Sequence, residues 1–441
     1  EEEREGRAIT SLNITITLIL RADTAHGRAN LKLSLRVNTV NLKRAKRESM
    51  SRVTESLKRL NVKNDAGTRG QGDEMVGKKV ELTLSLEETV SHDQNYILSP
   101  EFTIGAGLSD HSCVIYSVGE STSRMITLDH NQAPIVGVKF SPTSKNILYI
   151  ATNDGLITAC DLRAKGKVVA EFKDGTEDGK TKPLASFDLS CDERLVAGGT
   201  EHTGGDAFIL FWDIRQSGSK IGNKNNLLGG YWESHMDDVT CLTFHPTKRN
   251  VLASGSTDGL MNIFDLMQSS EDLALTSSLN TESSVDRLGW LTDDSLWCTT
   301  HTHLQLWECE GACAYETFAR SHLAVSRKDD PDNCYLVKFH TTNVFGQPFL
   351  LAGSSTVTRE NLRCLSIREN CLETCYEIIG NKQIVRDSWI HEKSGSLVTV
   401  GEKGIINVWR QAESPTQRDS DHKLLTKIGN GCDRHHRIKP Y

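Results

Sequence analysis

No run of apolar residues in this chain is long enough to cross a membrane, and the first residues, Glu1 to Glu3, do not resemble a secretory signal. There is no aromatic residue before Tyr96 and no cysteine before Cys113. All 12 cysteines follow, and many are flanked by apolar residues, which is typical of reduced, buried thiols. We therefore expect a soluble protein of the cytoplasm or nucleus.

The sequence also lacks the common catalytic motifs. No nucleophile elbow, phosphate loop or dinucleotide fingerprint stands between a strand and a helix. Asp237 and Asp238 are adjacent, and neighbouring strand residues point to opposite faces, so the pair does not have the geometry of two hydrolase carboxylates. We expect a protein that is not an enzyme and that has no cofactor.

Two sets of residues could be mistaken for metal ligands. The first consists of two cysteine pairs, Cys309 with Cys313 and Cys371 with Cys375. Their spacing is loose for a zinc site, and no glycine knuckle flanks them. The second set is His301 and His303, which we interpret as turn and surface residues. We therefore predict no metal site.

Charge is unevenly distributed along the chain. The net charge is −7, yet residues 1–78 hold 16 Lys or Arg against 10 Asp or Glu, which leaves a charge of about −13 on the remainder. An acidic body does not suit nucleic-acid binding. It favours protein or peptide partners with basic surfaces.

What the chain does contain is a repeat of short strands. The clearest unit runs from Val251 through Asp258 and Gly259 to Asp265, and it reads as two strands joined by an Asp-Gly turn. The strand ends that match across the repeat are Tyr116, Cys160, Trp212, Phe264, Trp307, Leu365 and Trp409. Their separations of 44, 52, 52, 43, 58 and 44 residues are typical of the blades of a β-propeller.

Particular residues in these units resemble the WD-repeat family. Trp212 and Asp213 close one unit with a Trp-Asp pair, and Trp409 ends the last unit. His235, Ser254, Asp258 and Phe264 resemble the hydrogen-bonded tetrad of that family, with Phe in place of Trp. The resemblance implies an all-β, seven-bladed WD-repeat propeller with a structural tetrad. It also implies a non-enzymatic scaffold for protein–protein interaction.

The pattern predicts a propeller over residues 80–410, closed by a strand from Val80 to Leu86 that pairs with the last blade. Residues 50–79 read as a short helix and a linker. Residues 1–49 read as an extension outside the fold, either disordered or a weak hairpin, and residues 411–441 as a polar to basic tail. We expect a monomer.

Four charged residues stand at the predicted starts of inner strands: Asp237, Asp238, Asp286 and Arg386. We interpret them as candidates for binding a basic or mixed-charge peptide on one face of the ring. The alternative is that they are ordinary solvated charges of the rim.

The segment Trp212, Asp213, Ile214 and Arg215 allows a sharper hypothesis. Trp-Asp-x-Arg at the end of a blade resembles the box of substrate receptors that dock on the adaptor of cullin-4 ubiquitin ligases. A guanidinium just past a strand end can reach outward to make bidentate contacts. The alternative is that Arg215 anchors its own loop or pairs with a neighbouring acid.

Overall fold

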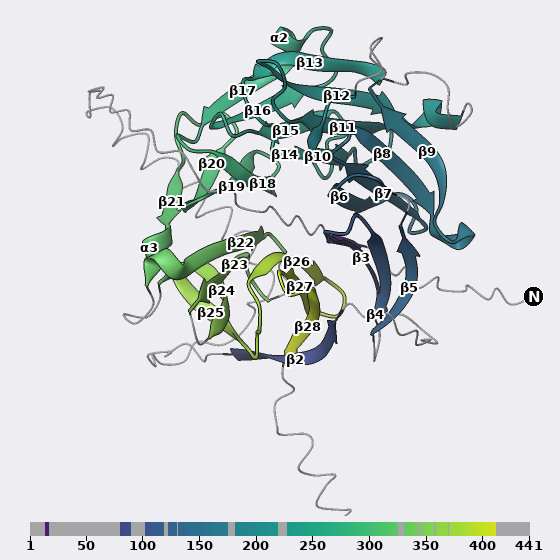
Figure 1. The fold of residues 1–441 in the computed structure, drawn as a ribbon. Coiled ribbons are helices and arrows are strands. Elements are labelled where there is room, and N and C mark those ends of the chain that lie inside the picture. The colour runs from purple at the N-terminus through teal and green to yellow at the C-terminus, as the bar shows by residue number, and fades with distance from the viewer. Residues whose placement is uncertain are drawn as a thin grey trace, which may run out of the picture.

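The repeated strands form seven blades around a central axis in the computed structural model (Figure 1). Five sheets have four strands each, and a sixth sheet of eight strands joins two blades. The seven-bladed propeller predicted from the repeat is therefore confirmed. The structure describes residues 14–16, 80–89, 102–118, 122–129, 131–174, 181–218, 227–324, 330–342, 345–356, 359–368 and 370–411.

Each blade runs from an inner strand at the axis to an outer strand at the rim. Blade one contains β3 (Phe102–Gly107), β4 (Cys113–Val118) and β5 (Thr122–Leu128), and blade two consists of β6 (Ile135–Phe140), β7 (Ile147–Thr152), β8 (Leu156–Asp161) and β9 (Lys167–Lys173). Blade three consists of β10 (Leu184–Leu189), β11 (Leu195–Thr200), β12 (Ala207–Asp213) and β13 (Leu227–His235). Blade four consists of β14 (Cys241–Phe244), β15 (Val251–Gly255), β16 (Leu260–Asp265) and β17 (Leu275–Asn280).

Blades five to seven complete the ring. Blade five consists of β18 (Val285–Thr292), β19 (Ser295–Thr300), β20 (His303–Glu308) and β21 (Glu316–Ala319). Blade six consists of β22 (Cys334–His340), β23 (Phe349–Ser355), β24 (Glu360–Arg368) and β25 (Cys371–Ile379). Blade seven consists of β26 (Val385–His391), β27 (Ser396–Gly401), β28 (Ile405–Gln411) and β2 (Val80–Thr89). Helices in the described residues are short: α2 (Glu271–Ala274), α3 (Arg320–Leu323) and the 3₁₀ turns η1 (Leu162–Ala164), η2 (Ile214–Gly218) and η3 (Pro331–Asn333). None of the helices within these ranges is long and apolar enough to span a membrane.

The core is divided into seven apolar layers, one between each pair of neighbouring blades. Each of the seven strand-end residues of the repeat lies in the strand next to the outermost one of its blade. Each also lies in a different one of these layers, where it packs toward the preceding blade. Trp212, Phe264 and Trp409 are fully buried there. The periodic spacing therefore reflects one packing position that recurs in every blade.

An N-terminal strand closes the ring, as predicted. β2 pairs antiparallel with β28 and so becomes the outer strand of blade seven. The first part of β2 also pairs, in parallel, with β25 of blade six, from Val80 beside Tyr376 to Thr83 beside Ile379. This second ladder was not expected, and it joins blades six and seven into the sheet of eight strands.

A second N-terminal segment takes part in blade one. β1 (Ile14–Ile16) lies parallel to β3, with Ile14 beside Ile104 and Ile16 beside Ala106. The predicted extension over residues 1–49 did not include such a contact. The other residues of that extension, the helix expected within residues 50–79 and the tail from residue 412 lie outside the described residues.

Candidate functional site: the two loop faces of the ring

The antiparallel order of the strands defines two opposite faces. We name the face at which inner strands such as β14, β18 and β26 begin the start face, and the opposite one the end face. In blade three, Ala207 at the beginning of β12 pairs with His235, whereas Trp212 near its end pairs with Leu227. Asp237 and Asp238, which follow His235, therefore lie on the start face, and Arg215, which follows Trp212, lies on the end face.

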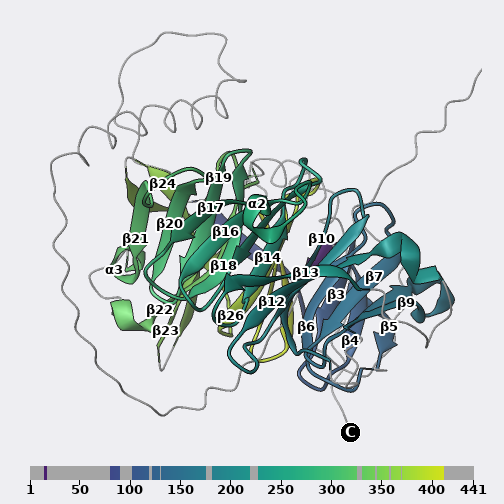
Figure 2. The ribbon, with the colours of Figure 1, turned by 90° about the horizontal axis from the view of Figure 1, so that it is seen from above.

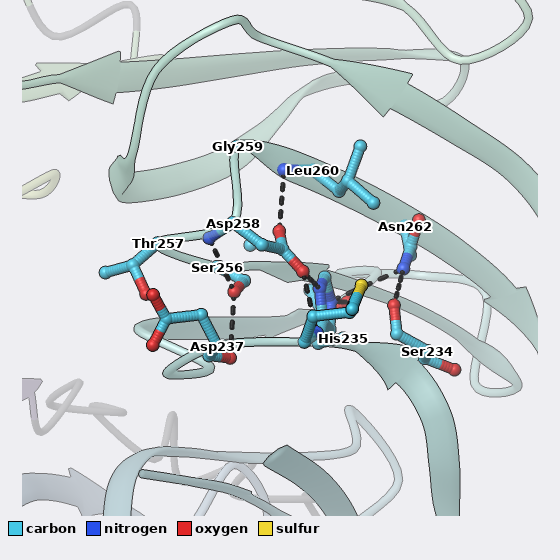
Figure 3. A network of polar contacts seen from close by, with 12 residues as sticks. Ser234, His235, Asp237, Ser256, Thr257, Asp258, Gly259, Leu260 and Asn262 are labelled. Carbon is cyan, nitrogen blue, oxygen red and sulfur yellow. Dashed lines mark hydrogen bonds and ion pairs between the residues drawn. The ribbon is translucent and has the colours of Figure 1, made fainter. Parts of the chain in front are cut away.

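Blade four carries a polar network at the start face (Figure 3). His235 is buried, with its Nδ1 atom 3.0 Å from Asp258 Oδ2 and its Nε2 atom 2.7 Å from Ser254 Oγ. The Asp258 carboxylate also accepts from the backbone N–H groups of Met236 and Leu260, at 3.1 and 2.8 Å. The network fixes the turn around Gly259, whose φ of +86° suits glycine.

Burial alone would raise the pKa of Asp258, but the hydrogen bond from His235 and the two backbone donors hold it below its usual value. Phe264 contributes no hydrogen bond, and its ring centroid lies 4.8 Å from that of Tyr231 in the layer between blades three and four. Ser254 is nevertheless hydrogen-bonded to His235. At the fourth position of the tetrad, the packing of Phe264 against Tyr231 therefore takes the place of a hydrogen bond.

The two tryptophans that were also assigned to the tetrad, Trp212 and Trp409, make different hydrogen bonds. Trp409 donates from Nε1 to Thr399 Oγ1 at 2.8 Å inside blade seven, whereas Trp212 donates to the carbonyl oxygen of Lys173 in blade two at 3.2 Å. In blade seven the buried link to the third strand is Gln383, whose amide donates to the carbonyl of Ile405 at 2.7 Å. Sequence reasoning missed Gln383 because it placed Asn381 at the position of the His.

The adjacent acids before β14 have different environments. Asp238 accepts a hydrogen bond from the backbone N–H of His202 at 2.7 Å and so ties blade four to a turn of blade three. Asp237 is exposed, and its carboxylate accepts from the N–H of Asp238 at 2.8 Å. Asp237 is therefore the member of the pair that can face a partner.

Asp286 and Arg386 are also exposed on the start face, each at the second position of its inner strand. Arg386 is already paired, because its Nε atom donates to Glu402 Oε1 at 2.8 Å. Because of this pairing, the net charge of this part of the start face is close to zero. The two residues lie on different blades, β18 in blade five and β26 in blade seven.

Exposed charges on the start face are segregated. In the described loops and inner-strand starts from Asp110 to Asp286, no Lys or Arg is exposed. Lys173, the last residue of the outer strand β9, is exposed beside this sector, and Lys182 is half-buried against Asp174. The exposed acids of this sector are Asp110, Asp129, Asp154, Asp206, Asp237, Glu282 and Asp286. Over blades six and seven the face is mixed, with Arg359, Lys382, Arg386 and Lys403 beside Asp330, Asp332 and Glu402.

On the end face, Arg215 is held by its own blade. Its backbone N–H and Nε donate to Asp213 Oδ1 at 3.0 Å each, and Nη2 donates to Asp213 Oδ2 at 2.6 Å. The hydrogen bonds from Arg215 keep the pKa of Asp213 below its usual value. Arg163 holds Asp161 in the same way in blade two, which has no Trp at that position.

The remaining candidates of the sequence are dispersed. Cys375 donates from Sγ to the carbonyl of Cys364 at 3.2 Å, while Cys313 and Cys371 are exposed. His303 contacts Thr302 Oγ1 through Nδ1 at 2.6 Å, and His301 is exposed. Within the described ranges, no three His, Cys, Asp or Glu side chains come together as metal ligands.

Comparisons with known proteins agree with this architecture. The family model "WD domain, G-beta repeat" matches residues 228–265, which include the network of blade four. The chain is 26% identical over 340 residues to an uncharacterized WD repeat-containing protein of Saccharomyces cerevisiae, covering 72% of this chain and 79% of that one. It is 26% identical over 196 residues to the WD repeat-containing protein 89 homolog of Dictyostelium discoideum, covering 42% and 52%.

A chain of the crystal structure of the mitotic checkpoint complex has a similar fold. The TM-score is 0.52 at 15% identity, over 80% of this chain and 98% of that chain, so the likeness concerns the fold alone. The WD-repeat resemblance of the sequence is confirmed by the family model and by these relatives.

Proposed function

We propose that this WD-repeat propeller is a non-enzymatic scaffold that binds other proteins through its start face. The observation that carries the proposal is the acidic sector between Asp110 and Asp286, where exposed acids are not balanced by exposed Lys or Arg in the described loops. Clustered charge of one sign attracts partners of the opposite sign and sets the rate and salt dependence of association. The partner is a basic or mixed-charge peptide segment.

The start face is suited to such a segment because its charges stand on rigid supports. Asp237 follows the buried His235 network, and Asp286 stands on an inner strand. The mixed sector over blades six and seven, where Arg386 pairs with Glu402, would accept the acidic residues of a mixed-charge partner. Preorganised charges of this kind lower the ordering cost of binding.

The test is to reverse the exposed acids and follow the bound partners. The variant Asp237→Lys with Asp286→Lys should lose co-purifying proteins, and the remaining ones should be released by salt less steeply. Asp238 is left intact because it bonds His202. The matched control is Asp293→Lys with Asp294→Lys, since these two acids are largely exposed on the end face. A partner set that is the same in both variants and the wild type refutes the proposal.

The finer alternative is a substrate receptor that docks on a cullin-4 ligase adaptor through Trp212 to Arg215. Arg215 has its side chain 62% exposed, so part of the guanidinium is accessible on the end face. The same Asp–Arg arrangement in blade two means that the geometry by itself does not single out Arg215. We therefore place this alternative second and treat Arg163 as its internal control.

A further inference from the structure

Exposed apolar side chains are concentrated on blades three and four, where Leu228 and Trp232 stand on β13, and Leu273 and Leu275 stand on α2 and at the beginning of β17. Nine large apolar side chains are exposed in the described part of the chain, and six of them fall between Leu228 and Leu275. These six are Leu228, Trp232, Met236, Met267, Leu273 and Leu275, with exposed fractions of 57, 42, 80, 70, 62 and 37%. The other three, Met125, Val169 and Ile379, stand singly on the outer strands of blades one, two and six.

The chain brings the two halves of this group together. Glu271 at the beginning of α2 accepts hydrogen bonds from the backbone N–H groups of Trp232 and Glu233, at 2.7 and 2.9 Å, and from the hydroxyl of Ser234. These bonds hold α2 of blade four against a bulge in β13, the outer strand of blade three. Figures 1 and 2 both place α2 beside β13 at the rim.

Trp232 is partly exposed and is held in place by neighbouring side chains. Its ring meets the ring of Phe208 edge to face, with centroids 5.1 Å apart, and Lys182 Nζ lies 5.7 Å from its centroid. These supports fix the orientation of the indole, yet 42% of the residue is exposed. Large aromatic and Met side chains held in this way are typical of protein interfaces, where exposed apolar clusters bind partners.

The exposed charges of the two segments have one sign, and Lys182, which lies near the Trp232 ring, is half-buried and paired with Asp174. Residues 227–235 and 260–280 contain Glu233, Asp265, Glu271 and Asp272 and no Lys or Arg. A segment with an apolar stripe and basic flanks complements both properties at once, and an amphipathic helix supplies that pattern at i, i+3, i+4 and i+7.

We infer that the outer wall of blades three and four, from Leu228 and Trp232 to Leu273 and Leu275, docks an amphipathic helix with Lys or Arg beside its apolar stripe. This surface is distinct from the start face. It gives the propeller a second binding surface, on the rim, where a partner can remain attached while the start face is occupied.

Binding is tested with a labelled peptide of about five helical turns, in which Leu forms one stripe and Lys flanks it. Fluorescence anisotropy should show binding to the wild type, and binding at least tenfold weaker to Leu228→Gln with Leu273→Gln. These neutral changes leave the charge as it is. The matched control Met125→Gln removes a comparably exposed apolar side chain from blade one and should bind as the wild type does. The Asp237→Lys, Asp286→Lys variant should also bind, which separates this surface from the start face.

Two further peptides sharpen the test. Replacing Lys by Glu, or Leu by Gln, should abolish binding, because the surface needs both basic flanks and an apolar stripe. If either peptide binds as tightly as the peptide with Leu and Lys, the inference is wrong. It is also wrong if Met125→Gln weakens binding as much as Leu228→Gln with Leu273→Gln does. Sedimentation of the unliganded wild type as a dimer that Leu228→Gln with Leu273→Gln converts to a monomer overturns it as well, since a second copy would then cover the wall.

Discussion

Arg287 of blade five reaches past blade six to Asp387 of blade seven, with Nη1 3.4 Å from Asp387 Oδ1. Its Nη2 atom also donates to the carbonyl of Arg386 at 2.9 Å. Lys338 of blade six approaches the same carboxylate oxygen at 3.4 Å, and the backbone N–H of Ser388 donates to it at 2.7 Å. One buried carboxylate thus links three consecutive blades near the axis.

We predict that Asp387→Asn lowers the free energy of unfolding by about 1–3 kcal/mol at pH 7, because both cations lose their shared partner. Burial alone would raise the pKa of Asp387, but Lys338 and Arg287 bring it below its usual value. Because its pKa is lowered in the folded state, the ionised Asp387 stabilises the fold at pH values above its unfolded-state pKa of about 4. This stability is lost as the pH falls through the folded-state pKa. The difference between variant and wild type should therefore shrink below about pH 4.

Urea unfolding between pH 7 and the acid limit of folding measures this difference. The control is Glu402→Gln, which removes the exposed partner of Arg386 and should cost well under 1 kcal/mol. A constant difference at every pH would show that Asp387 acts by shape and not by charge.

The network of blade four gives a second prediction. His235→Ala removes the hydrogen bonds that His235 makes with both Ser254 and Asp258, so it should lower the free energy of unfolding by about 2–4 kcal/mol. Ser254→Ala removes one hydrogen bond and should cost about 1 kcal/mol. In the double variant the two effects should fall short of their sum, because the residues share a bond. Full additivity in thermal or urea unfolding would mean that the network is not coupled.

The recurrent strand ends could be predicted because each performs the same task, packing its side chain on the preceding blade, whatever its chemical type. Cys160 and Leu365 fill this position as Trp212 does. The Asp387 cluster could not be predicted, since Arg287 and Asp387 stand 100 residues apart and no local pattern pairs them. For the same reason the sequence indicated His235 and Asp258 but not the role of Glu271, which depends on a bulge in another blade.

The closing strand gives a third prediction. A chain that begins at residue 90 lacks β2, and this exposes the edges of both β28 and β25. Unpaired edges favour aggregation, so this chain should be recovered in aggregates or unfold at a markedly lower temperature. A chain that begins at Met50 keeps β2 and, among the described residues, loses only the three residue pairs of β1, so it should melt close to the full chain. If the chain from residue 90 is a stable monomer, closure by β2 is dispensable.

The last prediction concerns Arg215 and uses Arg163 as a matched control. Both arginines clamp the Asp two residues before them through the backbone N–H, Nε and Nη2, and both are largely exposed. Arg215→Ala and Arg163→Ala should therefore change the melting temperature little and by similar amounts. If the Trp212 to Arg215 segment docks on a ligase adaptor, only Arg215→Ala should abolish recovery of the adaptor in a pull-down. Failure of the wild type to recover the adaptor, or equal loss in both variants, leaves Arg215 as a clamp of its own loop.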